Sequence, residues 1–162
     1  MILGMSLSTF TTVHVVISLA GILSGLVVVA GLLGNRRMDG WTALFLATTV
    51  ATSVTGFFFP FHGLDPADYV GILSLLVLLL AILARYPQHL RGGWRKVYVI
   101  TAVIALYFNC FVAVVQSFQK IPALHTFAPK GNEPPFAAAQ LVLLVLFVVL
   151  GVMAARRFRP TA

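Results

Sequence analysis

The sequence predicts an all-α membrane protein: a compact antiparallel bundle of five transmembrane helices, with the N-terminus outside and the C-terminus inside. Three observations predict this class. Of the 162 residues, 60% are hydrophobic and only 9% are charged, whereas a soluble domain carries about 25% charged residues. Long apolar runs recur along the chain, and the basic residues gather in alternate connections between them. Such a chain has too few charges to cover a surface exposed to water.

The apolar runs define the predicted helices, because a membrane span needs about 20 mostly apolar residues. Five segments meet this requirement, approximately Ser8–Leu33, Trp41–Phe59, Ala67–Ala84, Lys96–Ser117 and Phe136–Ala155. Short connections make successive helices antiparallel, so residues 1–162 are expected to form a single domain. The third segment is almost pure Leu, Val, Ile and Ala, and it is expected to have the largest lipid-facing surface.

The breaks between these segments contain residues that start helices. Asp39 is expected to cap the second helix, and Asp65 followed by Pro66 has the pattern of a cap and a first-turn proline. Glu133-Pro134-Pro135 is expected to begin the fifth helix in the same way.

The orientation follows from the positions of Lys and Arg. Nine of the eleven basic residues fall on one side of the predicted bundle: Arg36, Arg37, Arg85, Arg91, Arg95, Lys96, Arg156, Arg157 and Arg159. Only Lys120 and Lys130 fall on the other side. The positive-inside rule places the basic side in the cytoplasm. The net charge of +7 is then explained without a nucleic-acid partner, and no nucleic-acid-binding motif is present. Cys110, the single cysteine, excludes an intrachain disulfide and a CxxC motif.

Three stretches of the sequence carry a resemblance to a known group of proteins. They are HVVISLAGILSG, DGWTALFLATTVATSVTGFFFPFHG and EPPFAAAQ. Together with the layout of the chain, they resemble a family of small multi-pass inner-membrane proteins of bacteria. The resemblance implies a bacterial source and an inner-membrane location, and it implies no function and no site residue.

Polar residues inside the predicted spans are the candidates for a site. His14 shares one face of the first helix with small and hydroxyl residues, including the Gly21-Ile-Leu-Ser-Gly25 motif, and such faces point toward protein rather than lipid. On four helices, the polar groups that are costliest to place in lipid lie in the outer half of the membrane. This distribution predicts an outward-facing polar pocket. The predicted cofactor-binding residues are His14, Ser18, Thr52, Thr55, Asn109, Gln116 and Gln140.

Several functions remain open at this stage. The pocket could bind a lipid-soluble ligand or cofactor, such as a quinone or haem b, or the protein could be an accessory subunit of a membrane complex. Haem would need a second ligand beside His14, and His62 is the nearest choice; a copper site is less favoured because no ligand spacing is diagnostic.

The alternative functional class is an oligomeric channel or small-solute transporter, in which a homo-oligomer would use the same helix faces. The polar faces could also serve packing alone, with His14 hydrogen-bonded inside the bundle. No catalytic set and no metal site are predicted, so the protein is not expected to be an enzyme.

Overall fold

The structure is a computed structural model that describes residues 2–60 and 66–160. Its helices are α1 (Leu7–Leu33), α2 (Asp39–Gly56), α3 (Pro66–Arg85), α4 (Trp94–Lys120), α5 (Pro122–His125) and α6 (Pro134–Arg157). Helix makes up 78% of the described residues, and no strand occurs among them. The all-α prediction is therefore confirmed. The one-turn helix α5 was not predicted; it lies in the connection that follows α4.

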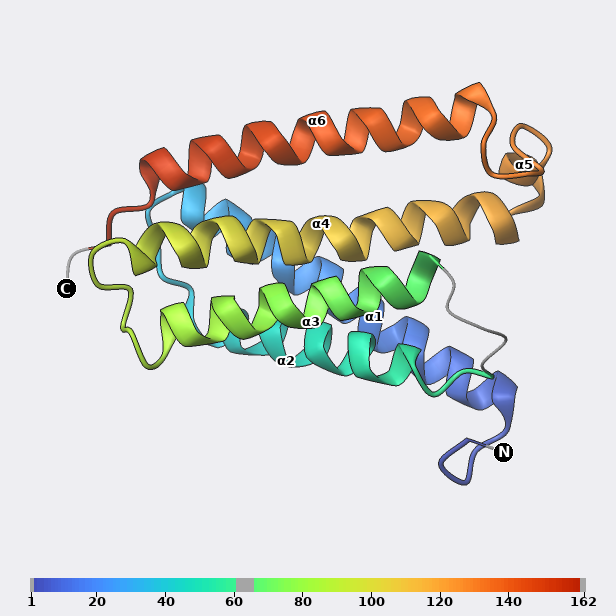
Figure 1. Ribbon diagram of the computed structural model, residues 1–162, viewed down its shortest axis with the longest axis horizontal. Helices are drawn as coiled ribbons and strands as arrows, with labels where there is room; N and C mark the ends of the chain where they lie inside the picture. The colour runs from blue at the N-terminus through green and yellow to red at the C-terminus, as the bar shows by residue number, and fades with distance from the viewer. Residues whose placement is uncertain (1, 61–65, 161–162) are drawn as a thin grey trace.

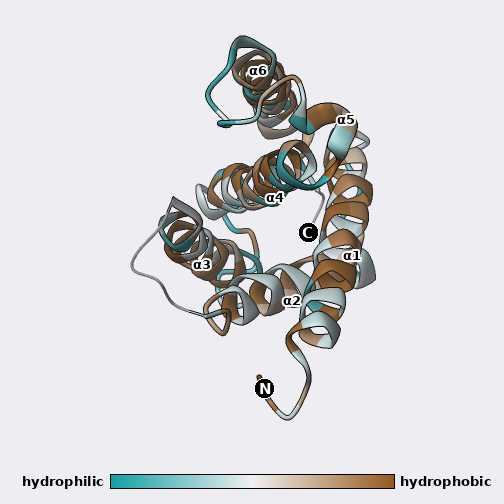
Figure 2. Ribbon diagram, turned by 90° about the vertical axis from the view of Figure 1, so that its right-hand side faces the viewer, coloured by the Kyte–Doolittle hydropathy of each residue, from teal (hydrophilic) through white to brown (hydrophobic). Residues whose placement is uncertain are grey.

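Helix α4 lies at the centre of the bundle and contacts every other helix. Helices α2 and α3 lie on one side of it and α6 lies on the other, whereas α1 crosses behind α4 and also contacts α6 (Figure 1; Figure 2). The sequence of α4 explains this position, because small and apolar residues such as Val99, Ala102, Ala105 and Leu106 follow one another at helical spacing and are all buried. The prediction of a helical bundle is confirmed.

Four helical segments are long and apolar enough to cross a membrane: Leu7–Leu33, Asp68–Arg85, Trp94–Lys120 and Pro134–Arg157. Helix α2 has 18 residues and is more polar, because six of them are Thr or Ser. Several of these hydroxyls bond to their own helix: Thr48 Oγ1 donates to the Leu44 carbonyl at 2.7 Å and Thr55 Oγ1 to the Ala51 carbonyl at 2.7 Å. This back-bonding satisfies a hydroxyl wherever the helix lies.

Helices α1, α2 and α4 approach one another closely at the glycines of α1. Gly21 and Gly25 are both buried. A Cβ atom built at Gly25 would lie 2.6 Å from Leu106 Cδ1 of α4 and 2.8 Å from Phe45 Cε2 of α2. The prediction that this small-residue face points toward protein is confirmed.

The prediction that Asp39 caps α2 is wrong. The N-cap residue is Met38, which makes no side-chain cap, and Asp39 follows it as the first residue of the helix. The Asp39 carboxylate instead accepts a hydrogen bond from Arg85 Nη2 and lies 3.5 Å from Arg37 Nε. The side chain of Arg85 is only 2% exposed, and a buried guanidinium requires a counter-charge more strongly than a helix end requires a cap.

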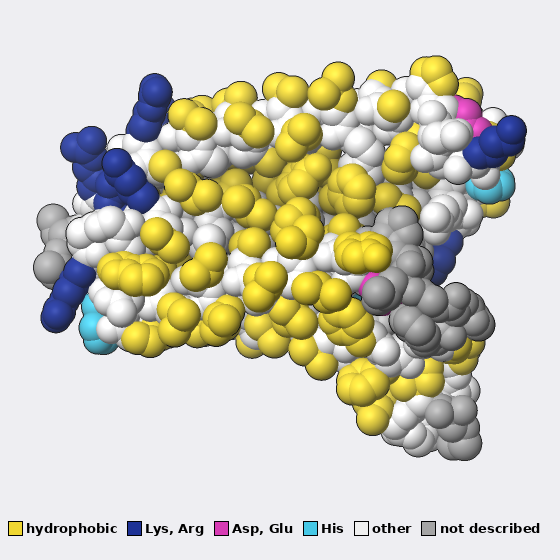
Figure 3. All heavy atoms as spheres, in the orientation of Figure 1, with side chains coloured by type: hydrophobic (Ala, Val, Ile, Leu, Met, Phe, Trp, Pro, Cys, Tyr) yellow, Lys and Arg dark blue, Asp and Glu magenta, His cyan; other side chains and the backbone are white. Residues whose placement is uncertain are grey.

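The expectation that the third helix has the largest lipid-facing surface is also wrong. Helix α3 packs against α2 and α4, and its buried residues are Ser74, Leu78, Ala81, Ala84 and Arg85. Helix α6 contacts only α4 and α1 among the helices and buries just Phe147 and Ala154. Hydrophobic side chains cover its outer surface in Figure 3. Composition cannot reveal this difference, because both helices are apolar all round.

Candidate functional site

His14 of α1 is hydrogen-bonded to Thr55 of α2, with 2.8 Å between Nδ1 and Oγ1. Thr55 Oγ1 also lies 2.7 Å from the Ala51 carbonyl, and a hydroxyl can donate to a carbonyl while it accepts from an imidazole N–H. The imidazole also packs edge-on against Phe59, with ring centroids 5.2 Å apart. Ser18 donates to the His14 carbonyl at 2.7 Å and therefore points back along its own helix.

Asn109 of α4 makes a separate contact. Its Nδ2 donates to Thr49 Oγ1 of α2 at 3.2 Å, and both groups lie against the bare backbone of Gly21. A glycine at this position lets an amide and a hydroxyl from two other helices reach the surface of α1. The contact fixes the crossing of three helices.

The remaining predicted residues lie in different surroundings. Gln140 of α6 donates from Nε2 to the Phe111 carbonyl of α4 at 3.3 Å, and its Oε1 is buried without a partner in the described part of the chain. Thr52 Oγ1 is likewise buried without a partner there. Gln116 is exposed.

The predicted site residues therefore fall into separate helix–helix contacts. His14 pairs with Thr55, Asn109 with Thr49, and Gln140 with the Phe111 carbonyl. These bonds are the interactions expected of residues that hold a bundle together. They favour the packing interpretation for His14 and Asn109 over a shared polar pocket.

The histidines offer no clustered metal ligands in the described residues, where no group of three His, Cys, Asp or Glu side chains is placed to hold a metal ion. His62, the suggested second haem ligand, lies outside the described residues. His125 is exposed in α5, and His89 is exposed in the connection between α3 and α4.

An apolar groove lies between α4 and α6, and we call it the α4–α6 groove. Its volume is about 350 Å³, and it is lined by Ile100, Val103, Ile104, Tyr107, Leu144, Phe147, Val148, Gly151, Val152 and Ala155. A Cβ built at Gly151 would lie at ordinary contact distance, 3.5 Å, from Val103 Cγ1 across the groove. Figure 3 shows hydrophobic side chains gathered along this face between the two helices.

An aromatic cluster closes one end of the groove, near the middle of both helices. The Tyr107 ring lies 5.7 Å from that of Phe147 and 6.1 Å from that of Phe111, measured between centroids. The Gln140–Phe111 contact lies one turn beyond the groove lining on both helices. Among the described residues, polar groups therefore adjoin the groove beside this cluster and at the opposite end of the groove, where basic residues lie.

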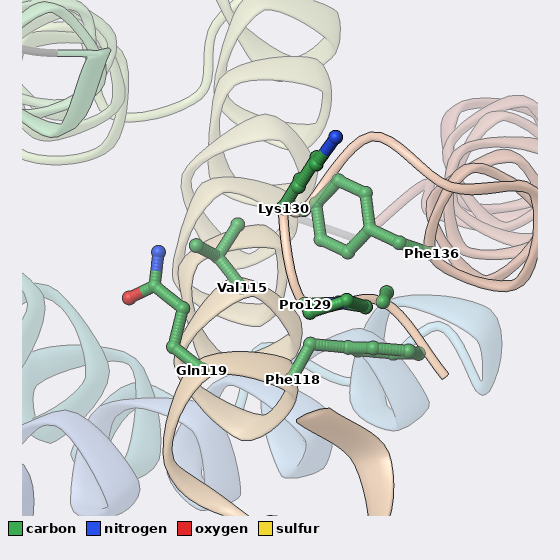
Figure 4. A pocket seen from close by; sticks show the side chains of 8 residues that line it. Val115, Phe118, Gln119, Pro129, Lys130 and Phe136 are labelled. Carbon is green, nitrogen blue, oxygen red and sulfur yellow. The ribbon is translucent and has the colours of Figure 1, made fainter. Parts of the chain in front are cut away.

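A second cavity, of about 150 Å³, lies where α4 ends against the loop that leads into α6. Phe118 and Phe136 meet edge to face beside it, with centroids 5.5 Å apart, and Gln119 lies across from Phe136 (Figure 4). Its size suits a few water molecules rather than a lipid-soluble ligand.

Sequence reasoning missed the α4–α6 groove because it followed polar residues. The groove is made by Ile100, Val103, Ile104 and Tyr107 on α4 and by α6 residues among which Gly151 and Ala155 are small. These two small residues were the available signal, but which two helices face each other depends on the tertiary structure.

Comparison with known proteins adds no assignment: no family model, curated protein or solved structure matches the chain.

Proposed function

We propose that this protein is a multi-pass protein of the bacterial inner membrane that binds a lipid-soluble molecule in the α4–α6 groove. One observation carries the proposal. An apolar groove of about 350 Å³ runs between two helices that are each long and apolar enough to span a membrane. Ligand sites are concave, mostly apolar and supplied with a few polar groups, and Tyr107 supplies such a group in the lining here.

The proposal includes five membrane spans, with α2 as the fifth. Two contacts support α2 as a span. Its first residue, Asp39, pairs with Arg85 at the end of α3, and Thr55 near its end pairs with His14 near the start of α1. If α1 and α3 cross the membrane, α2 connects the same two faces. Its length of about 27 Å, at 1.5 Å per residue, is close to the thickness of the hydrocarbon core.

The lining of the groove bears on the class of ligand. No histidine, cysteine or methionine lines it, so it offers none of those side chains as an axial ligand for haem iron. An apolar row suits a flexible hydrocarbon or isoprenoid tail instead. A role as an accessory subunit remains compatible with this proposal, because α6 is largely uncovered. A channel along the polar faces is less favoured, because Asn109 and Thr49 close the α1–α2–α4 contact.

The proposal is tested by blocking the groove. Val148 lines the groove and is 56% exposed, whereas Val142 is on the same helix, is 68% exposed and lies outside the groove. The wild type and the variants Val148→Trp and Val142→Trp are purified in mild detergent, and bound molecules are counted by native mass spectrometry. We expect about one lipid-soluble molecule per chain in the wild type and in Val142→Trp, and its loss in Val148→Trp. Equal retention in both variants would contradict the proposal.

A further inference from the structure

The α4–α6 groove ends beside two basic residues. On α4, Lys96 precedes the groove residue Ile100 by four positions, and on α6, Arg156 follows the groove residue Val152 by four. Residues four apart lie one above the other on a helix face. Each wall of the groove therefore leads, one turn further on, to a cation. Both side chains are exposed.

Arg95 holds these two helix ends together. Its Nη1 donates to the Ala155 carbonyl at 3.2 Å and also to the Phe158 carbonyl. These bonds satisfy carbonyls at the end of α6, which have no partners within the helix. The start of α4 and the end of α6 are thus fixed side by side, and Lys96 and Arg156 flank the same end of the groove. Figure 3 shows Lys and Arg side chains gathered at this end of the molecule.

No carboxylate neutralises this pair of cations in the described residues. The ion pairs present there join Asp39 to Arg37 and Arg85. Asp68 and Glu133 belong to the starts of α3 and α6, which lie at the opposite end of the bundle. The uncompensated charge at the groove entrance therefore favours an anionic group.

The groove is short enough to lie within one leaflet of a membrane. Between the aromatic cluster at Phe147 and the basic end at Ala155, the wall on α6 extends about 12 Å, at 1.5 Å of rise per residue. Half of the hydrocarbon core is about 15 Å thick. A chain that enters at the basic end would reach Tyr107 near the midplane and stop at the aromatic cluster.

We propose that the occupant of the α4–α6 groove is an anionic phospholipid from the leaflet on the basic side. One acyl chain lies in the groove, and the phosphate lies between Lys96 and Arg156. This inference rests on the proposed function, because it names the molecule that the same groove binds. Zwitterionic phospholipids and neutral quinones have similar tails but lack the net negative head group.

The test compares head groups on the full chain in detergent. Delipidated protein is titrated with phosphatidylglycerol and with phosphatidylcholine of identical acyl chains, and the singly bound fraction is measured by native mass spectrometry. The double variant Lys96→Gln/Arg156→Gln is compared with Arg36→Gln/Arg91→Gln, which removes the same charge from exposed residues at the same end but away from the groove. The double variant Lys96→Arg/Arg156→Lys keeps both charges.

We expect the wild type to bind phosphatidylglycerol more tightly than phosphatidylcholine. Neutralising Lys96 and Arg156 should weaken phosphatidylglycerol binding by about tenfold or more, since each basic residue near a membrane surface adds substantially to attraction for anionic lipid. The control pair and the charge-keeping pair should bind as the wild type does, and phosphatidylcholine binding should not change.

Three results would overturn different parts of this reasoning. Equal binding of both lipids or of a neutral quinone, abolished by Val148→Trp, would contradict the anionic head group and leave the groove as a binding site. Binding that Val148→Trp does not reduce would contradict the proposed function itself. An equal loss in the control pair would show that general surface charge, rather than Lys96 and Arg156, attracts the lipid.

Discussion

A histidine within an apolar helix needs a hydrogen-bond partner, and in this protein the partner is Thr55 of a neighbouring helix. The Thr55 hydroxyl also lies 2.7 Å from a carbonyl of its own helix, to which it can donate while it accepts from His14. The sequence suggests His14 as a ligand, but in the structure its Nδ1 contributes to helix packing. Its Nε2 has no hydrogen-bond partner among the described residues.

We expect His14→Leu to lower the free energy of unfolding by about 1–3 kcal/mol, because it removes the donor that satisfies Thr55 in a place with little water. The measurement is thermal unfolding in detergent, followed by far-UV circular dichroism. Thr55→Val should also destabilise the protein, and the double variant should lose less than the sum of the two single losses, with a coupling of about 0.5–1.5 kcal/mol. Additive losses would show that the two side chains do not interact.

At the scale of the helices, the closest contact is the crossing of α1, α2 and α4 at Gly21 and Gly25. Small residues allow helix backbones to approach in a membrane, where no hydrophobic effect drives helices together. At Gly21 the space is used by polar groups from Asn109 and Thr49, and at Gly25 it is used by the Leu106 and Phe45 side chains. The same motif therefore supports both a hydrogen bond and apolar packing.

We expect Gly25→Ala to destabilise the bundle by about 1–3 kcal/mol, because the new methyl group would lie well inside contact distance of Leu106 and Phe45 and force them to move. Gly40→Ala is the matched control, since no atom lies within 4 Å of a Cβ built there. It should leave stability unchanged or raise it by up to about 1 kcal/mol through helix propensity. Thermal unfolding of both variants checks this, and similar effects at the two positions would argue against a close crossing.

The sequence predicts the positions of the helices well, but it predicts poorly which helices and side chains contact one another. The five predicted segments fall on α1, α2, α3, α4 and α6 with ends within a few residues, because hydropathy and prolines define helix ends locally. The Gly21–Gly25 face was also predictable, since small residues have a direct packing meaning. The role of Asp39 was not, because it depends on Arg85, which is 46 residues away in the chain. The α4–α6 groove depends likewise on which helices face each other.

At the scale of the whole molecule, the two ends of the bundle are held differently. The basic end is tied by side chains that reach across helices: Arg85 to Asp39, Arg95 to the carbonyls that end α6, and Asn35 to the backbone of Arg159 at 2.6 Å. The opposite end is held by the His14–Thr55 pair and by edge-to-face rings such as Phe10 and Phe59. Charged side chains thus hold one end together, and by the positive-inside rule the same end is predicted to face the cytoplasm.

The orientation and the number of spans are tested together by reporters at three positions. We expect a reporter fused after Gly34 to be cytoplasmic, one fused after Pro60 to be external, and one fused after Ala162 to be cytoplasmic. This pattern follows from five spans with the nine basic residues inside. A protein whose α2 does not cross would place both Gly34 and Pro60 inside and Ala162 outside, and an inverted five-span protein would reverse all three positions. Alkaline phosphatase, active only outside, and a fluorescent protein, fluorescent only inside, give complementary signals at each position. The Pro60 fusion is the decisive one for α2, because the Asp39–Arg85 and His14–Thr55 contacts predict that its two ends lie on opposite faces if α1 and α3 cross the membrane.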